Sequence, residues 1–284
     1  MELITADLGS FNIKSNLGIV LENRFEKDNG SDTFGAEVLS WEGNNYFFGR
    51  GEFNKTLSKA HKEIEIPLFY LLGKSKVDGE VNLILHLPAE QMPMKKMIID
   101  KLQGKSFTYK VNGNEYSVSF KKVGVLKEGW ASFYSLAKRN QGLISVIDIG
   151  GRTTDIFTFA NGISEQEKSL QVGTMDLFEE IACKLNGEGQ NRKIEDIHKL
   201  LTHDIIKIED FQEIVEHYAK KIINGSKLRI NNLQDYKIDL TGGGAKYFVA
   251  EFNKEFDKVE IMTNNLCSNC TGSLNIGKAK GFDK

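Results

Sequence analysis

The sequence predicts an α/β protein made of two related halves, and two observations support this prediction. Continuously apolar runs, such as Val81 to Leu87 and Leu143 to Ile149, are typical of strands buried on both faces of a sheet. A strand ending in aspartate, a glycine turn and a second strand occur together twice, at Ile4 to Lys14 and at Ser145 to Phe159. Because the two copies lie about half the chain apart, they indicate a duplicated design.

The first half reads mainly as strands with helices between them. Asn112-Gly113-Asn114 is a turn signal between two strands, and a second signal, Gly43-Asn44-Asn45, predicts another hairpin. Apolar residues at helical spacing predict helical structure in three places, Asn54 to Gly73, Met92 to Leu102 and Gly129 to Arg139.

The second half reads as a hairpin followed by helices and one last buried strand. The chain is predicted to be mostly helical from Gly173 to about Asn224. Tyr236 to Leu240 is a short apolar strand, and a helix is predicted from Ala245 to Phe256. The tail from Gly272 to Lys284 is expected to form a short helix.

Charge and hydropathy exclude several classes of function. The 284 residues include 37 basic and 39 acidic side chains, a net charge of -2, which gives no reason to expect direct nucleic-acid or membrane binding. Self-repulsion is low, which permits self-association. No apolar stretch approaches the ~20 residues that span a bilayer, and the N-terminal residues lack the features of a signal peptide. We therefore expect a cytoplasmic protein.

The three cysteines fit a reducing compartment. Cys267 and Cys270 form a C-x-x-C, which is compatible with half a zinc site or a redox pair. Because no second C-x-x-C exists and Cys183 is the only other cysteine, the favoured interpretation is two small structural residues.

The first glycine turn has residues suited to a phosphate. A turn without Cβ atoms lets backbone N–H groups approach an anion, and Gly9 stands in this turn. Ser10 adds a hydroxyl donor and Lys14 a cation. Asp7, at the end of the preceding strand, is suited to hold Mg²⁺ through the ion's water shell.

The second glycine turn repeats this chemistry with more acidic side chains. Gly150 and Gly151 form the turn, and two hydroxyl donors follow at Thr153 and Thr154. The carboxylates that flank this turn, Asp148 and Asp155, are further candidates for water-mediated contact with Mg²⁺.

A third glycine turn and one glutamate complete the candidates. The flat surface after the buried strand suits an adenine ring or an α-phosphate at a helix N-terminus, and it consists of Gly242, Gly243, Gly244 and Ala245. Glu128 is suited either to orient the water that attacks a γ-phosphate or simply to cap a helix. The glycine motifs of P-loop and dinucleotide-binding proteins are absent from the sequence.

These three loops resemble the phosphate-1, phosphate-2 and adenosine motifs of the actin, sugar kinase and heat-shock ATPase superfamily, and within it the ParM (StbA) group of plasmid-segregation actins. The segment from Asp7 to Lys14 is similar to the group's D-x-G-S-x-N-I-K, which adds Asn12 to the nucleotide-binding candidates. The segment from Asp148 to Asp155 fits D-x-G-G-x-T-x-D, with Arg152 at a variable position that should point away from the phosphate. Glu128 falls where the group has its catalytic glutamate.

The resemblance implies an actin-like (ribonuclease H-like) fold with a nucleotide cleft between duplicated domains, each a five-stranded mixed sheet with flanking helices. Domain I would cover residues 1–141, with an inserted subdomain at about 31–76. Domain II would cover residues 142–264, with a helical subdomain at about 173–234. The tail, residues 265–284, would return to domain I.

The resemblance also implies an activity. The protein would bind MgATP, polymerise into filaments and hydrolyse ATP, with Glu128 and Asp148 as catalytic residues and Asp7, Asp148 and Asp155 around Mg²⁺. Such filaments segregate plasmid DNA through a DNA-binding adaptor protein, so DNA would be an indirect partner. GTP remains an alternative to ATP, because the TGGGA loop contains nothing that reads a purine edge.

Other activities on the same fold stay open. A non-filament scaffold that binds ATP, a small-molecule kinase and a polyphosphate or nucleotide phosphatase would use similar loops. A kinase needs a general base aimed at a substrate hydroxyl and is usually longer, so the filament ATPase is favoured.

Overall fold

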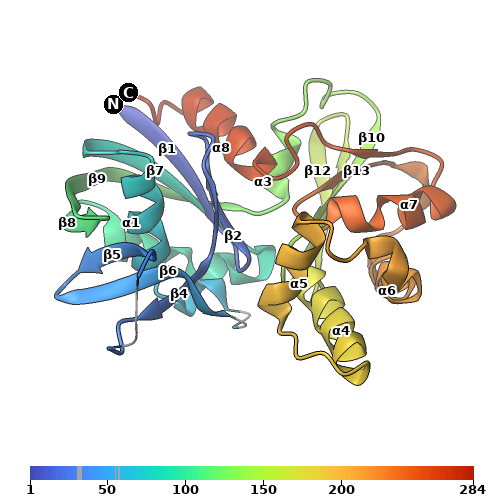
Figure 1. Ribbon diagram of the computed structural model, residues 1–284. Coiled ribbons are helices and arrows are strands. Elements are labelled where there is room, and N and C mark those ends of the chain that lie inside the picture. Colours follow the sequence, from blue (N-terminus) through green and yellow to red (C-terminus); the bar gives the residue numbers. More distant parts are fainter. Residues whose placement is uncertain (31–33, 55, 57) are drawn as a thin grey trace. The chain divides into compact units, whose positions relative to one another are not determined.

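The computed structural model describes residues 1–30, 34–54, 56 and 58–284, and the chain forms two compact units (Figure 1). Unit 1 comprises Met1–Leu136 together with Cys267–Lys284, and unit 2 comprises Ala137–Leu266. The start of the inserted subdomain predicted at 31–76 falls on residues 31–33, which lie outside the described residues.

Unit 1 is built on a mixed sheet that has nine strands within the described residues, in the order β3-β2-β1-β7-β9-β8-β5-β6-β4. Only the β1–β7 and β7–β9 pairs are parallel. The strands are β1 (Glu2–Leu8), β2 (Asn12–Ser15), β3 (Val20–Glu22), β4 (Arg24–Lys27), β5 (Glu37–Trp41), β6 (Asn44–Phe53), β7 (Gly79–Leu87), β8 (Ser106–Val111) and β9 (Asn114–Lys127).

Unit 2 has a mixed sheet of five strands, in the order β12-β11-β10-β13-β14. The β10–β13 and β13–β14 pairs are parallel, and the others are antiparallel. The strands are β10 (Leu143–Ile149), β11 (Thr154–Ala160), β12 (Ile163–Leu170), β13 (Lys237–Thr241) and β14 (Val259–Ile261).

The two sheets share one topology. The strands β3-β2-β1-β7-β9 repeat β12-β11-β10-β13-β14 in order and in every relative direction. The duplicated α/β fold is therefore confirmed. The predicted strand number holds for unit 2, but unit 1 extends its five-stranded core by four strands, because β8 pairs with both β9 and β5.

Helices cover the unit 1 sheet, and several differ from the predicted bounds. They are α1 (Glu65–Lys74), α2 (Lys95–Leu102), α3 (Trp130–Phe133) and α8 (Ser268–Ala279), with 3₁₀ turns η1 (Lys59–His61) and η2 (Ala89–Met94). Pro67 lies in the first turn of α1, where its missing N–H has no helical partner to lose. The helix predicted from Gly129 to Arg139 is wrong in length: after Phe133 the chain continues in i→i+3 turns.

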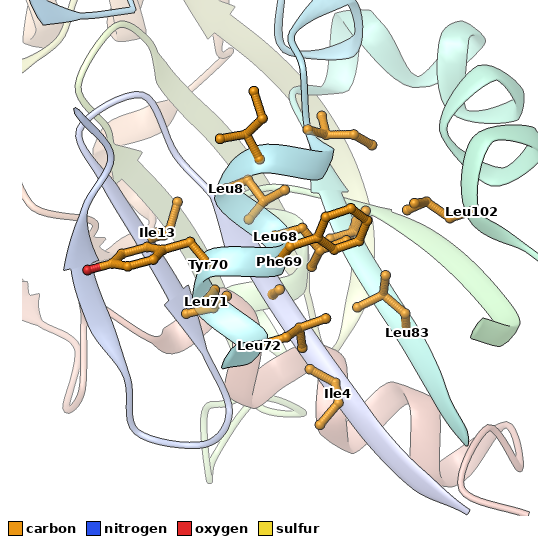
Figure 2. Close-up of a cluster of buried hydrophobic side chains, with 14 of the residues drawn as sticks. Ile4, Leu8, Ile13, Leu68, Phe69, Tyr70, Leu71, Leu72, Leu83 and Leu102 are labelled. Carbon is orange, nitrogen blue, oxygen red and sulfur yellow. The ribbon is translucent and has the colours of Figure 1, made fainter. Parts of the chain in front are cut away.

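The core of unit 1 lies between α1 and the sheet. Figure 2 shows Leu68, Phe69 and Leu72 of α1 beside Ile4 of β1 and Leu83 of β7. All five side chains are buried, which explains why the residues around Pro67 are almost continuously apolar. This packing supports β1, which contains Asp7 and is followed directly by the first glycine turn.

Unit 2 is richer in helix, as predicted for the region after Gly173. Its helical elements are α4 (Thr174–Gly187), α5 (Ile194–Thr202), η3 (Ile208–Phe211), α6 (Gln212–Arg229), η4 (Leu233–Asp235) and α7 (Ala245–Glu255). Among the described residues, no helix combines the length and apolar character needed to cross a membrane.

Candidate functional site

The first glycine turn joins β1 to β2 in unit 1. Asp7 is the sixth residue of β1 and lies directly opposite Lys14 of β2 in the antiparallel register. Directly opposed side chains share one face of a sheet, and the Lys14 ammonium is 3.4 Å from Asp7 Oδ2. Gly9 and Ser10 form the turn between them, and Asn12 is the first residue of β2.

A second lysine, which the sequence analysis did not single out, reaches the same aspartate. Lys59 of η1 is buried, and its Nζ donates to Asp7 Oδ1 at 2.8 Å. The same Nζ forms an ion pair with Glu128 Oε1. The predicted metal-binding aspartate and the predicted catalytic glutamate are therefore joined by one ammonium group.

A third lysine contacts the turn itself. Lys62 Nζ donates to Ser10 Oγ at 2.9 Å. Asn23 holds the turn from its other side, since its Nδ2 donates to Gly9 O at 2.6 Å and its backbone N–H donates to Phe11 O at 2.8 Å. Three cationic side chains thus approach one short loop, an arrangement suited to a polyanion.

Glu128 stands in a turn that the C-terminal helix supports. Gly129 has φ 63° and ψ -48°, a conformation that favours glycine, and its N–H donates to Asn269 Oδ1 of α8 at 2.9 Å. Ser132 Oγ donates to the same oxygen at 2.7 Å. Asn269 is buried, so this turn has a defined shape that does not depend on a ligand.

Burial and neighbouring charges have opposite effects on the pKa values of Asp7 and Lys59. Burial alone would raise the pKa of Asp7, but the ammonium groups of Lys59 and Lys14 hold it well below its usual value. Burial alone would lower the pKa of Lys59, but Asp7 and Glu128 raise it above its usual value. Asp7 and Lys59 are therefore both charged at neutral pH.

His86 of β7 is a neutral neighbour of this cluster. Burial lowers its pKa to about 4, and the nearby Lys59 adds to the shift while Asp7 opposes it. Its Nδ1 is 3.0 Å from Ala6 O and its Nε2 is 2.6 Å from Ser273 Oγ of α8. The ring therefore serves as a hydrogen-bonded part of the core.

The second glycine turn joins β10 to β11 in unit 2. Asp148 is the sixth residue of β10 and lies directly opposite Asp155 of β11. Asp155 accepts hydrogen bonds from Thr153 Oγ1, at 3.2 Å, and from Ser169 Oγ. Two carboxylates thus lie on one face of the sheet, next to the turn. This arrangement suits a divalent cation that keeps most of its waters.

The remaining residues of this turn have structural partners. The N–H of Gly150 donates to Thr153 O at 2.9 Å and closes the turn that contains Gly151. Thr154 is buried, and its hydroxyl donates to Val172 O at 2.9 Å. The Arg152 guanidinium lies 4.0 Å from Asp176 Oδ1.

The third glycine turn packs directly against the second. Gly242 has φ 81°, and a Cβ there would lie 2.4 Å from Asp148 Oδ1 and 2.4 Å from Ile149 O, so only glycine fits. The N–H of Gly244 donates to Ile149 O at 2.9 Å. A Cβ on Gly243 would meet only Leu266 Cδ2, at 3.9 Å. Gly243 is therefore the position whose Cα faces open space, and Ala245 begins α7 beside it.

Two of the three cysteines are buried, and Cys183 is exposed. Cys267 and Cys270 are both buried without a disulfide, and Cys270 Sγ donates to Lys14 O at 3.6 Å. Burial raises the pKa of Cys270. Among the described residues, no group of three or more His, Cys, Asp or Glu side chains is arranged to hold a metal ion.

Sequence reasoning missed Lys59, Lys62 and Asn269. The two lysines lie in a segment interpreted as helical, where they are indistinguishable from surface lysines until the fold brings them to Asp7 and Ser10. Asn269 lies inside the C-x-x-C, and its role depends on α8 packing against the Glu128 turn. No local sequence signal reports either contact.

Comparisons with known proteins agree with this geometry. Residues 146–254 match the family model of the C-terminal part of archaeal MreB-like actin homologues. An archaeal actin homologue solved with ADP is similar with a TM-score of 0.84 at 19% identity, over 98% of this chain and 100% of that one. A subunit of a 15-stranded ParM filament from Clostridium botulinum gives 0.80 at 18%, with 98% and 100% covered. A nucleotide-free ParM gives 0.70 at 17%, with 99% of each chain covered. A search of curated proteins finds no match.

The repeated sheets and their paired glycine turns therefore define an actin-like fold, and the resemblance predicted from the loops is confirmed at that level. Within this class, unit 2 contains the segment that matches the MreB-like archaeal actin homologues.

Proposed function

We propose that this protein is an actin-like ATPase that binds MgATP, assembles into filaments and hydrolyses ATP. One observation carries the proposal: both units present an aspartate and a glycine turn at the same place in the same sheet topology, with cations around one turn and carboxylates around the other. A magnesium–triphosphate complex carries both signs of charge and needs both kinds of partner.

The two units have complementary parts in this proposal. Unit 1 supplies the phosphate contacts, with Gly9, Ser10, Asn12 and Lys14 from the hairpin. Unit 2 supplies Mg²⁺ contacts through water from Asp148 and Asp155, and phosphate contacts from Gly150, Gly151, Thr153 and Thr154. The nucleoside lies on the third turn, where Gly243 faces open space beside Gly242, Gly244 and Ala245.

Asp7 has a more restricted role toward the metal than Asp148. Both of its oxygens already accept an ammonium group, from Lys59 and from Lys14, so a cation would have to compete with two lysines. A water-mediated contact with Mg²⁺ stays compatible with this arrangement. When bound, Mg²⁺ would neutralise charge on the phosphates.

Glu128 is the proposed residue that orients the attacking water. It lies in a turn fixed by Asn269, and its carboxylate is paired with Lys59, so it is held in place and ionised. If filament breakdown follows hydrolysis, the same residue sets filament lifetime. Segregation of plasmid DNA through a DNA-binding adaptor is the use of such a filament that the ParM resemblance supports.

The test measures light scattering and phosphate release on one sample, for wild type and Glu128→Gln. With MgATP, wild type should assemble and then disassemble, whereas Glu128→Gln should assemble and persist because phosphate release falls about 100-fold. Nucleotide affinity should change little, because the glycine turns and lysines provide the binding.

The other outcomes distinguish the competing functions. Phosphate release at the wild-type rate in Glu128→Gln would exclude the catalytic assignment. Nucleotide binding without scattering would indicate a non-filament scaffold, and phosphate transfer to an added small molecule would indicate a kinase. Release without transfer or assembly would indicate a phosphatase.

A further inference from the structure

In unit 1, Lys59 bridges two residues of the proposed nucleotide site. Its ammonium contacts Asp7 Oδ1 at 2.8 Å and also contacts Glu128 Oε1, so one cation joins the ends of β1 and β9. The Lys59 side chain is 8% exposed and that of Glu128 14%. Burying a lysine costs free energy unless its charge is compensated, and here both compensating groups are candidate active-site residues.

The segment that carries Lys59 is itself fixed by the protein. The N–H of Ala60 donates to Gln91 Oε1 at 3.1 Å, and Lys62 binds Ser10 at 2.9 Å. The N–H of Lys62 donates back to Lys59 O at 3.3 Å, which closes the η1 turn. Lys59 is thus placed by contacts of the residues that directly follow it in the chain.

Glu128 benefits from such an anchor. A glutamate side chain has three rotatable bonds and samples several positions unless a partner fixes it. Asn269 fixes the backbone of the turn at Gly129, and the ion pair with Lys59 holds the carboxylate itself. A residue that orients a water must be both ionised and held in one place.

We propose that Lys59 is a positioning residue of the nucleotide site, which holds the Glu128 carboxylate in the orientation that hydrolysis needs and ties it to Asp7. This inference rests on the proposed ATPase function and adds a residue to it. A purely structural ion pair would stabilise unit 1 without any specific effect on turnover.

The experiment compares Lys59→Met with Lys74→Met. Lys74 is a matched control, because it forms an ion pair with Glu37 at 2.8 Å elsewhere in unit 1. Calorimetric titration gives the affinity for MgADP, and single-turnover phosphate release gives the rate with MgATP. Lys59→Met should release phosphate about 10- to 100-fold more slowly, with MgADP affinity within about threefold of wild type. Lys74→Met should match wild type in both.

A double-mutant cycle with Glu128→Gln shows whether Lys59 acts through Glu128. If it does, Lys59→Met/Glu128→Gln should release phosphate no more slowly than Glu128→Gln alone. In the nucleotide-free protein, the double variant should also recover part of the melting temperature lost in Lys59→Met, because the carboxylate charge that has lost its lysine partner is gone as well. If Lys59→Met does not fold, Lys59→Gln is used in its place, because glutamine keeps a hydrogen-bond donor.

Two results would overturn the inference. One is phosphate release at the wild-type rate in Lys59→Met. The other is a double variant whose fold-reduction in phosphate release equals the product of the reductions in the two single variants. Failure of wild type to bind ADP or ATP would overturn the proposed function instead, and is read from the wild-type titration alone.

Discussion

The hairpin of β1 and β2 in unit 1 and the hairpin of β10 and β11 in unit 2 share one backbone design but differ in charge. In each, an aspartate is the sixth residue of the first strand and lies directly opposite the residue seven positions later. In unit 1 that residue is Lys14, and Lys59 adds a second cation. In unit 2 it is Asp155, a second carboxylate.

The difference shows how one duplicated element can take two roles. Opposite charges directly across an antiparallel pair stabilise it, whereas like charges are unfavourable, each by about 0.2–1 kcal/mol. Unit 1 has the stabilising pair and unit 2 the unfavourable one. Under the proposed function, Asp148 and Asp155 would lie near the Mg²⁺ of MgATP, whereas Asp7 is held by two lysines of the protein itself.

Replacing each aspartate by asparagine should give the largest difference between the two hairpins. Asp148→Asn should weaken Mg²⁺-dependent nucleotide binding about 100-fold, because a metal partner is lost, while the nucleotide-free protein melts no earlier than wild type. Asp7→Asn should instead destabilise the nucleotide-free protein by about 3 kcal/mol, since Lys59 and Lys14 lose their shared partner. Titrations with and without Mg²⁺, together with melting curves, measure both. Equal effects of the two variants would refute the division of roles.

A methyl group beside Asp148 tests the packing of the second and third turns. Gly242→Ala should cost about 2 kcal/mol, because its φ of 81° disfavours a Cβ that would also lie 2.4 Å from Asp148 Oδ1. Gly243→Val is the control for folding, and it should leave the melting temperature of the nucleotide-free protein almost unchanged. The same valine should abolish most of the stabilisation by ATP, because it would occupy the place proposed for the base. Normal ATP stabilisation of Gly243→Val would contradict that placement.

Acid should destabilise unit 1 through His86. Its pKa is about 4 in the fold against an ordinary value of 6.5, so between these pH values the unfolded chain binds a proton that the folded chain does not. Stability is therefore fully present above about pH 6.5 and is lost as the pH falls toward 4. The loss from pH 7 to 5.5 should be about 1 kcal/mol. Denaturant unfolding at the two pH values measures it, and His86→Gln should reduce the loss. An equal loss in that variant would assign it to other groups.

The sequence predicts the backbone of both turns because the signal is local. An apolar strand, an aspartate and glycines specify a strand end and a turn whatever surrounds them, as Asp7-Leu8-Gly9 and Asp148-Ile149-Gly150 show. The duplication is visible for the same reason. The register that opposes Asp7 to Lys14 also follows from a short hairpin, because a short loop restricts the pairing.

What the sequence could not predict depends on contacts between distant segments. Lys59 meets Asp7 from 52 positions away, and Asn269 meets Gly129 from 140 positions away. Three of the additional strands of the unit 1 sheet, β5, β6 and β4, join it through the pairing of β5 with β8, and these two strands are more than 60 residues apart in the chain, as in the pair Ser40–Lys110. The roles of the individual site residues stay predictions until the variants are measured.

The position of α8 in the chain has a consequence for how the protein is made. Asn269 and Ser273 bind Gly129 and His86, yet all of unit 2 is translated between these partners. At about 5–20 residues per second, synthesis of that stretch takes roughly ten seconds. During this interval the nascent unit 1 lacks the support that Asn269 gives to the Glu128 turn. Unit 1 is therefore completed only after unit 2 has been synthesised.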